Sequence, residues 1–314
     1  MVASQRVAIV GAGHVGATAA YALMLRGLFG EIVLIDSNDA LAEAEAADLS
    51  DANALARPAR IWAGSYDEAA DAQIAVITAG AATHGSETRL SVTSRSAVVV
   101  AGCVDQLIAG GFSGVIVVAA NPVDLMSLLA FRRAGLPAAR VIGTGTLLDT
   151  MRLRQNLASR LNVAASSING FVLGEHGDSE VAAFSTVRVG GQTLGEYASG
   201  GPPCSHDEVA REVRQQGYRV ISGKGYTSFG IATAIVRICE AVLRNECTVL
   251  TASTLLTGQY GISDLYLSLP CVISAAGVER VLAPDLGEQE RTGIVASAQA
   301  IRDALAQMDS SLAP

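Results

Sequence analysis

Residues 6–16 of the sequence read Arg-Val-Ala-Ile-Val-Gly-Ala-Gly-His-Val-Gly, and this stretch decides the fold. Its first five residues are mainly apolar and predict a buried strand that runs straight into a glycine-rich turn. Helical periodicity follows from about Val15 to Leu28, and a second apolar run, Glu31–Ile35, ends at Asp36. Strand, glycine-rich turn, helix, strand and acid in this order predict a βαβ unit that binds a dinucleotide.

The three glycines and the acid have separate physical roles in such a unit. Gly11 permits the tight turn, Gly13 lets the backbone approach a pyrophosphate at the helix N-terminus, and Gly16 lets the helix pack closely on the strand. Asp36 lies 20 positions after Gly16 and can accept hydrogen bonds from a ribose diol. A glycine turn used only for packing would need no acid at this spacing. Because Asp36 would repel a 2′-phosphate and residues 37–39 include no arginine, the sequence favours NAD over NADP.

Apolar strands continue to alternate with helices up to about residue 144. This alternation is typical of a doubly wound parallel α/β sheet that is covered on both faces and binds its ligands at the carboxyl ends of the strands. From Leu147 the pattern changes, so we expect a Rossmann domain at 1–144 and an α+β substrate domain with antiparallel strands at 145–314. The further strands are expected at 60–63, 74–77, 115–118, 141–142, 168–173, 181–184, 187–189, 249–256 and 265–273, and the further helices at 40–55, 90–109, 206–222, 226–245 and from 288.

Composition narrows the class of protein. The net charge is −8 and lysines and arginines do not cluster, which argues against nucleic acid as a partner. Half of the residues are hydrophobic, yet apolar runs are too short for a membrane span. The first strand begins by residue 6, which leaves no room for a secretory signal. Five scattered cysteines form no metal-ligand pattern and favour a reducing cytoplasm, so we expect a cytoplasmic protein without a metal.

His176 is the strongest candidate for proton transfer. It lies in Gly174-Glu175-His176-Gly177, directly after the apolar run Ile168–Leu173. Imidazole titrates near neutral pH and is therefore suited to pass a proton at physiological pH. A lone histidine is more often structural than catalytic, and its surroundings have to decide between the two.

Asp149 and Arg152 stand one helical turn apart, so both side chains can point into one cleft. Taken alone, such a pair is more often an ordinary salt bridge on a helix. A planar guanidinium can also grip a substrate carboxylate through two parallel hydrogen bonds, which is the role that Arg152 fits.

Seven short motifs along nearly the whole chain together resemble the L-lactate/malate dehydrogenase family, and its bacterial L-lactate dehydrogenases in particular. They are GAGHVG, ITAG, ETRL, NPVD, LDTMRLR, GEHGDSE and KGYTS. Several motifs in the same order are far more specific than any one of them.

The resemblance implies NAD-dependent hydride transfer between a 2-hydroxy acid and a 2-oxo acid. It makes His176 the proton donor and acceptor, and Asp149 the carboxylate that orients it and stabilises its charged form. Arg89 would polarise the substrate carbonyl as hydride arrives. Asn121 would bond His176 or the substrate oxygen and lie beside the cofactor, and Thr227 would line the pocket.

Two positions depart from the family pattern. Lactate enzymes carry glutamine and malate enzymes arginine where this chain has Thr83, and lactate enzymes commonly carry alanine where it has Gly217. The pocket is therefore expected to be roomier and less polar than usual, and to take an uncharged 2-oxo acid such as pyruvate. A malate dehydrogenase, a relative that reduces another 2-oxo acid or an imine next to a carboxylate, and a nucleotide-binding scaffold without catalysis are the alternatives.

The resemblance also bears on assembly and regulation. It implies a homotetramer or a homodimer. Some bacterial lactate dehydrogenases bind fructose 1,6-bisphosphate through an arginine, matched here by Arg154, and a histidine, replaced here by Asn169. Asparagine carries no positive charge toward a phosphate, so the sequence argues against this effector.

Overall fold

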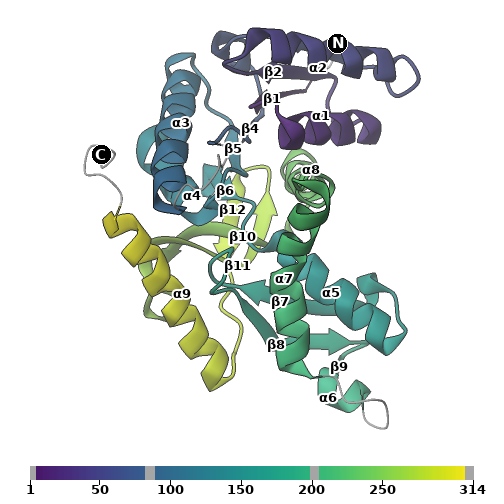
Figure 1. The fold of residues 1–314 in the computed structure, drawn as a ribbon, viewed down its shortest axis with the longest axis vertical. Coiled ribbons are helices and arrows are strands. Elements are labelled where there is room, and N and C mark those ends of the chain that lie inside the picture. Colours follow the sequence, from purple (N-terminus) through teal and green to yellow (C-terminus); the bar gives the residue numbers. More distant parts are fainter. Residues whose placement is uncertain (1–4, 82–88, 199–204, 308–314) are drawn as a thin grey trace.

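A large sheet forms the centre of the protein (Figure 1). The structure is a computed structural model that describes residues 5–81, 89–198 and 205–307, and only the backbone of residues 89–91. The sheet order in the described residues is β12-β11-β10-β6-β5-β4-β1-β2-β3. The strands from β6 to β3 run parallel, in the order expected for two βαβαβ halves. Their bounds are β1 Arg6–Val10, β2 Glu31–Ile35, β3 Arg60–Ala63, β4 Ile74–Ile77, β5 Val115–Val118 and β6 Val141–Gly143.

Alternate residues of the central strand face opposite hydrophobic cores. Val7 and Ile9 of β1 pack in one core with the helices α1 and α8, whereas Ala8 and Val10 pack in the other with α3, α4 and α9. Both faces are therefore covered, and the predicted doubly wound α/β fold is confirmed. The helices are α1 His14–Arg26, α2 Asp39–Asn53, α3 Arg89–Ala109, α4 Val123–Ala134, α5 Leu147–Leu161, α6 Leu194–Tyr197, α7 His206–Lys224, α8 Phe229–Leu243 and α9 Glu288–Gln307.

The C-terminal half of the chain extends the same sheet. Strands β10 (Thr248–Thr257), β11 (Ser263–Ser274) and β12 (Gly277–Val281) join it in antiparallel fashion. The junction pairs Ser253 with Gly143, where an added Cβ would stand 2.7 Å from Cβ of Ser253. The hydrogen-bonded sheet thus runs across the predicted division at residues 144 and 145, which the sequence pattern did not reveal.

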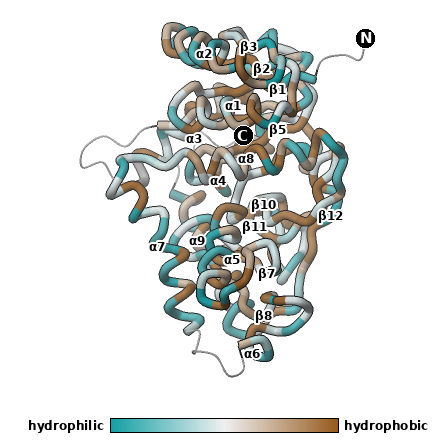
Figure 2. Tube along the Cα trace, turned by 90° about the vertical axis from the view of Figure 1, so that its right-hand side faces the viewer, coloured by the Kyte–Doolittle hydropathy of each residue, from teal (hydrophilic) through white to brown (hydrophobic). Residues whose placement is uncertain are grey.

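A second, small sheet lies in the lower part of the view in Figure 1. It contains β7 (Ile168–Leu173), β8 (Val181–Val189) and β9 (Gln192–Thr193). The prediction of separate strands at 181–184 and 187–189 is wrong, because β8 continues through a register shift opposite β7. Helices α5 and α7 cover this sheet with a third core. Figure 2 shows α7 alternating between hydrophilic and hydrophobic residues, as expected for a helix with one buried side.

Glycines account for two helix ends that differ from prediction. Helix α1 stops at Arg26 because Gly27 adopts a left-handed conformation with φ 60°, so the helix does not reach Leu28. Likewise, Gly225 (φ 88°) ends α7, and residues 226–228 form a turn before α8 begins at Phe229 instead of Tyr226. This turn carries Thr227 toward the nucleotide-binding half.

One described segment, Val92–Ala109 of α3, is long and apolar enough to cross a membrane by length and composition. Core helices of globular proteins pass the same test. Here Ala97, Val100, Val104 and Leu107 lie in the larger core, where α3 packs on α4. The segment is therefore explained as a core helix.

Candidate active site

The turn between β1 and α1 has the shape that a pyrophosphate requires. Gly11 has φ 105°, and a Cβ at this position would lie 2.6 Å from the backbone nitrogen of Ala79. A Cβ on Gly16 would lie 1.8 Å from the carbonyl oxygen of Gly11, so the helix can approach the strand only through glycine. Gly13 is exposed and opens α1 without a side-chain cap from any described residue. The first N–H groups of α1 are therefore not bonded by a capping side chain and are available to bind an anion.

Asp36 lies beside this turn at the carboxyl end of β2. Its Oδ2 accepts a hydrogen bond from the backbone of Ala12 at 2.7 Å, and its Oδ1 accepts one from Asn38 at 2.9 Å. These contacts orient the carboxylate next to the glycine turn, and each oxygen retains a second lone pair for a hydroxyl group. The geometry fits a ribose diol, and the residues present fit NAD.

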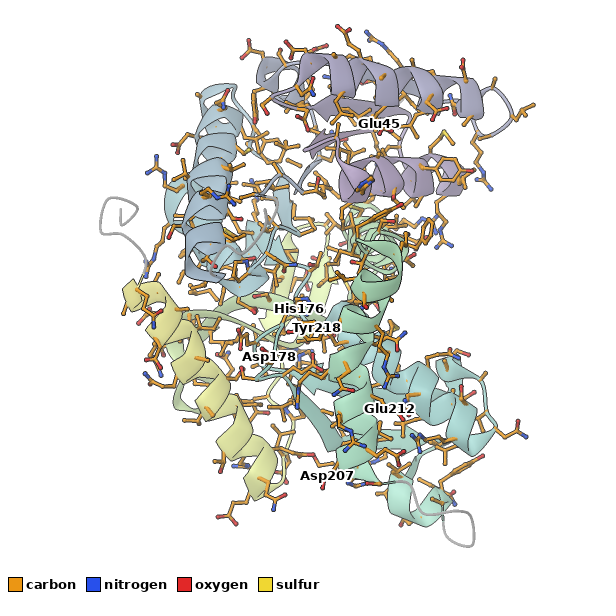
Figure 3. The ribbon with its side chains drawn as sticks, in the orientation of Figure 1. Glu45, His176, Asp178, Asp207, Glu212 and Tyr218 are labelled. Atoms are coloured by element: carbon orange, nitrogen blue, oxygen red, sulfur yellow. The ribbon has the colours of Figure 1, made fainter. Side chains whose placement is uncertain are left out.

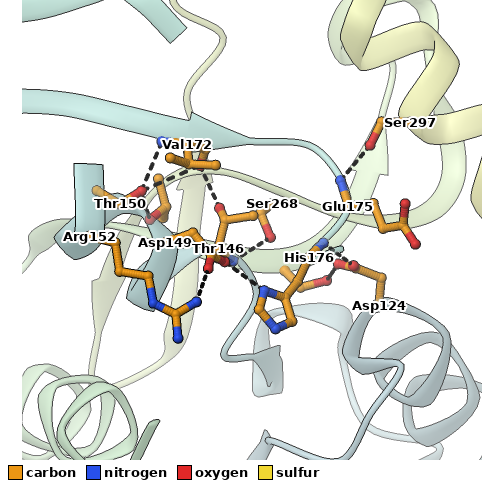
Figure 4. Close-up of polar contacts among 12 residues, drawn as sticks. Asp124, Thr146, Asp149, Thr150, Arg152, Val172, Glu175, His176, Ser268 and Ser297 are labelled. Carbon is orange, nitrogen blue, oxygen red and sulfur yellow. Dashed lines mark hydrogen bonds and ion pairs between the residues drawn. The ribbon is translucent and has the colours of Figure 1, made fainter. Parts of the chain in front are cut away.

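His176 lies near the middle of the molecule (Figure 3), and Asp149 and Arg152 lie beside it (Figure 4). Asp149 and Arg152 lie on the first turns of α5, and His176 follows β7. Oδ2 of Asp149 lies 2.6 Å from Nδ1 of His176, and Oδ1 accepts a hydrogen bond from Nη1 of Arg152 at 2.8 Å. One carboxylate therefore holds both groups, with its own side chain only 2% exposed.

Electrostatics favour the charged form of this triad. Burial raises the pKa of Asp149, but the positive charges of His176 and Arg152 outweigh it, so the net shift is downward. Burial lowers the pKa of His176, yet the carboxylates of Asp149, Asp124 and Glu180 raise it to about 9. At neutral pH the imidazole is thus protonated. It donates Nδ1–H to Asp149, and its side chain is 29% exposed, which leaves the other ring nitrogen accessible.

Hydroxyl groups hold the segment Gly174–His176 in place. Thr146, just before α5, and Thr150 of α5 donate to the carbonyl of Val172 near the end of β7, at 2.5 Å and 3.4 Å. Ser297 of α9 accepts a hydrogen bond from the backbone of Glu175 at 2.6 Å. Gly174 pairs with Ser268 of β11 through both backbone hydrogen bonds. Elements far apart in the sequence therefore fix the residues on either side of His176.

Asp124 also contacts this segment, a role that sequence analysis missed. Its Oδ2 accepts the backbone N–H of His176 at 2.8 Å. Asp124 is part of the NPVD motif that carried the family resemblance, so the sequence contained a signal for it. Ser297 had none, because an isolated serine on a helix shows no pattern.

Glu180 is a further buried acid next to the triad. Together with Asp149 and His176 it forms the described cluster whose ligand atoms lie within 4.8 Å of one another, close enough to hold a metal ion by distance. Burial and the charge of Asp149 raise the pKa of Glu180 to about 8, so it is mostly neutral at pH 7. A neutral acid and an aspartate already paired with Arg152 form a poor cation site. The prediction of no metal remains a prediction.

The remaining predicted residues lie around the triad or outside the described part of the chain. Gly217 of α7 faces Arg152, because an added Cβ would lie 3.6 Å from Nη1. Asn121 lies between β5 and α4 and is exposed, so its side chain is accessible to a ligand. Thr227 is partly buried. Thr83 and the side chain of Arg89 lie outside the described residues.

An aromatic contact joins the two binding regions. The ring of Tyr226, next to Thr227, stacks on that of His14 at the start of α1, with 4.0 Å between the ring centroids. The turn before α8 therefore lies against the glycine-rich turn. A cofactor bound at α1 would therefore lie beside the turn that carries Thr227.

Two family models match most of the chain. The lactate/malate dehydrogenase NAD-binding domain matches residues 5–143, and the lactate/malate dehydrogenase alpha/beta C-terminal domain matches residues 146–311. The chain is 40% identical to an L-lactate dehydrogenase of Treponema denticola over 310 residues, 97% of this chain and 98% of the relative. It is 39% identical to an L-lactate dehydrogenase of Clostridium botulinum, over 96% of each chain.

Solved structures give the same result. The minor L-lactate dehydrogenase from Enterococcus mundtii in its ligands-bound form superimposes with a TM-score of 0.95, at 38% identity over 98% of this chain and 99% of that chain. The ligands-unbound form of that protein has a TM-score of 0.88, at 36% identity over 98% of each chain.

Proposed function

The chain belongs to the lactate/malate dehydrogenase family, and we propose that His176, Asp149, Arg152 and Arg89 carry its reaction on an uncharged 2-oxo acid such as pyruvate. It is an NAD-dependent oxidoreductase of L-lactate dehydrogenase type that acts on the CH–OH group of a 2-hydroxy acid. The 2.6 Å contact between Nδ1 of His176 and Oδ2 of Asp149 is the observation that carries the assignment of roles.

Each residue of the triad has one task. Arg152 binds the substrate carboxylate with the guanidinium nitrogens that point away from Asp149. His176 gives its free N–H proton to the carbonyl oxygen in reduction and takes it back in oxidation. Asp149 holds the ring by Nδ1 and stabilises the imidazolium. The cofactor, when bound, supplies the hydride for the carbonyl carbon.

The cofactor site uses the first βαβ unit. Gly11, Gly13 and Gly16 shape the turn around a pyrophosphate, and Asp36 accepts hydrogen bonds from the adenosine ribose. Asn121, between β5 and α4, contacts the cofactor and the substrate in this proposal. Arg89 polarises the carbonyl, and Thr227 lines the pocket beside the turn at Tyr226.

Substrate choice rests on Thr83 and Gly217. A malate dehydrogenase has to pair a second substrate carboxylate, because burial of an unpaired charge costs several kcal/mol. Threonine supplies no charge, so oxaloacetate is a poor substrate. Larger uncharged 2-oxo acids compete with pyruvate, since each buried methylene contributes about 0.8 kcal/mol.

The test follows NADH absorbance with pyruvate, 2-oxobutyrate and oxaloacetate. We expect pyruvate and 2-oxobutyrate to be reduced with higher kcat/KM than oxaloacetate. His176→Asn should lose turnover and still bind NADH, as judged by NADH fluorescence, because the two tasks use different parts of the chain. Preference for oxaloacetate would assign the chain to the malate enzymes, and full activity of His176→Asn would remove His176 from proton transfer.

We further propose a cytoplasmic homotetramer or homodimer. Exposed apolar side chains support self-association: Tyr21 and Leu25 on α1 are 45% and 49% exposed, and Phe229 on α8 is 71% exposed. Light scattering on the purified protein measures the state. A monomer at micromolar concentration would contradict the proposal.

A further inference from the structure

We propose that Asp124 is a positioning residue for His176, one that both holds the backbone of the catalytic segment and places a second negative charge beside the imidazole. The inference rests on the proposed function of His176. It adds a residue on α4, in the nucleotide-binding half, to the control of proton transfer in the other half.

The geometry joins three elements at one carboxylate. Asp124 lies on the first turn of α4 and is 1% exposed. Its Oδ2 accepts the backbone N–H of His176 at 2.8 Å, and its Oδ1 accepts the hydroxyl of Ser253 on β10 at 2.5 Å. Figure 4 shows Asp124 on the side of His176 opposite Asp149. The segment that carries the imidazole is therefore tied to α4 and to the central sheet.

Hydrogen bonding alone does not account for a carboxylate here. An asparagine would accept from the backbone of His176 with its oxygen and donate to Ser253 with its amide, since a serine hydroxyl can also accept. It would avoid the cost of burying a charge. The charge itself is therefore the property to explain, and the N-terminal position on α4 favours it through the helix dipole.

The other charged groups around His176 do not account for all of the negative potential at its ring, and Asp124 contributes an important part of it. From α5, Asp149 faces the ring, but Arg152 offsets part of its charge. After the catalytic segment, Glu180 faces the ring and is mostly neutral at pH 7, with Arg214 of α7 nearby. Glu175, the residue before His176, lies close enough to Asp124 for the two charges to interact. Burial raises the pKa of Asp124 to about 6, so it remains ionised at neutral pH.

The charge of Asp124 should widen the pH range over which the protein reduces pyruvate. Reduction needs protonated His176, so kcat/KM for pyruvate is constant at low pH and falls as the ring loses its proton. The ionised Asp124 carboxylate holds that proton to higher pH. Asp124→Asn removes the charge and keeps both hydrogen bonds. We expect its descending limb to move down by about one pH unit, the shift typical of one nearby charge.

The experiment compares four proteins at saturating NADH: the wild type, Asp124→Asn, Asp124→Ser and Ser253→Ala. The Ser253→Ala variant is the matched control, because it removes a hydrogen bond to Asp124 and leaves the charge. Its descending limb should stay within about 0.3 pH units of wild type, a small fraction of the shift from one nearby charge. NADH affinity and the thermal unfolding midpoint are measured in each to show that the nucleotide site and the fold are intact. Asp124→Ser is a second neutral variant.

The outcomes separate the two proposals. A wild type that reduces none of the 2-oxo acids refutes the proposed function. An active wild type with an unshifted limb in the neutral variants overturns only the role of Asp124. Equal shifts in Asp124→Asn and Ser253→Ala would show that the shift does not depend on loss of the Asp124 charge and would also overturn it. If neither neutral variant folds, the carboxylate serves the fold and the proposal is wrong.

Discussion

Asp149 and His176 meet across a 2.6 Å contact between Oδ2 and Nδ1, although they come from a helix and a loop 27 residues apart. The contact fixes which ring nitrogen faces the substrate. Because Arg152 occupies the other oxygen of Asp149, one buried side chain holds the guanidinium and the imidazole at a fixed separation. In the proposed reaction, the same carboxylate would thus order the groups that bind both ends of a small 2-oxo acid.

Asp149→Asn should shift the pH dependence further than any change at Asp124. The pKa of His176 is raised above its ordinary 6.5 chiefly by Asp149, so loss of this charge lowers it from about 9. The protonated form needed for reduction is then lost at lower pH. We expect kcat for pyruvate reduction at pH 8 to fall by about 100-fold, in the range of general acid catalysis. A pH profile that matches wild type would contradict the assigned contact.

Arg152→Lys tests the carboxylate grip. Lysine keeps the charge but cannot form two parallel hydrogen bonds, so substrate binding should weaken by about 2 kcal/mol, or roughly 30-fold in KM for pyruvate. NADH affinity is the internal control and should not change. An unaltered KM would exclude Arg152 from the carboxylate site and leave it as a partner of Asp149 alone.

The sequence predicted the nucleotide-binding unit well because its signals are local. Gly11 and Gly16 stand where any side chain would clash, and such positions restrict the residue type regardless of the distant chain. The apolar runs of β4 and β5 match the predicted bounds for a related reason, since strands buried on both faces are continuous in hydrophobicity.

The pairing of distant segments could not be predicted from the sequence. The antiparallel strand β10 joins the large sheet through Ser253 and Gly143, 110 positions apart, and neither residue type indicates a partner. Ser297 and Asp124 reach the segment around His176 through side-chain hydrogen bonds from distant helices. Contacts of this kind depend on tertiary packing, which leaves no periodic pattern in the chain.

Fructose 1,6-bisphosphate should not activate the protein. Nε of Arg154 donates to the carbonyl of Gly170 at 3.2 Å, and its guanidinium lies over the ring of Phe171, so the cation is already engaged within the chain. Asn169 beside it is exposed and carries no charge. We expect KM for pyruvate to change less than about twofold with the bisphosphate at physiological salt, where an uncharged partner contributes little. A large fall in KM would show that a phosphate binds Arg154.

Gly217→Ala should narrow the substrate range and stabilise the fold. Gly217 lies inside α7, where alanine is favoured by about 1 kcal/mol over glycine. The new Cβ would stand 3.6 Å from Nη1 and 3.7 Å from Nη2 of Arg152, an ordinary contact that displaces no atom. It removes room beside the carboxylate grip. We expect pyruvate reduction to change little and kcat/KM for 2-oxobutyrate to fall by about fivefold, equivalent to roughly 1 kcal/mol for one methylene.

Gly223→Ala is the matched control for this change. Gly223 lies on the same helix, and an added Cβ there would meet no described atom within 4 Å, so the helix should gain stability without a new contact to Arg152. Both variants should raise the thermal unfolding midpoint, but only Gly217→Ala should alter the ratio of kcat/KM for 2-oxobutyrate and pyruvate. If the ratio is the same in both variants, Gly217 does not shape the pocket, and substrate size is set elsewhere, with Thr83 the remaining candidate.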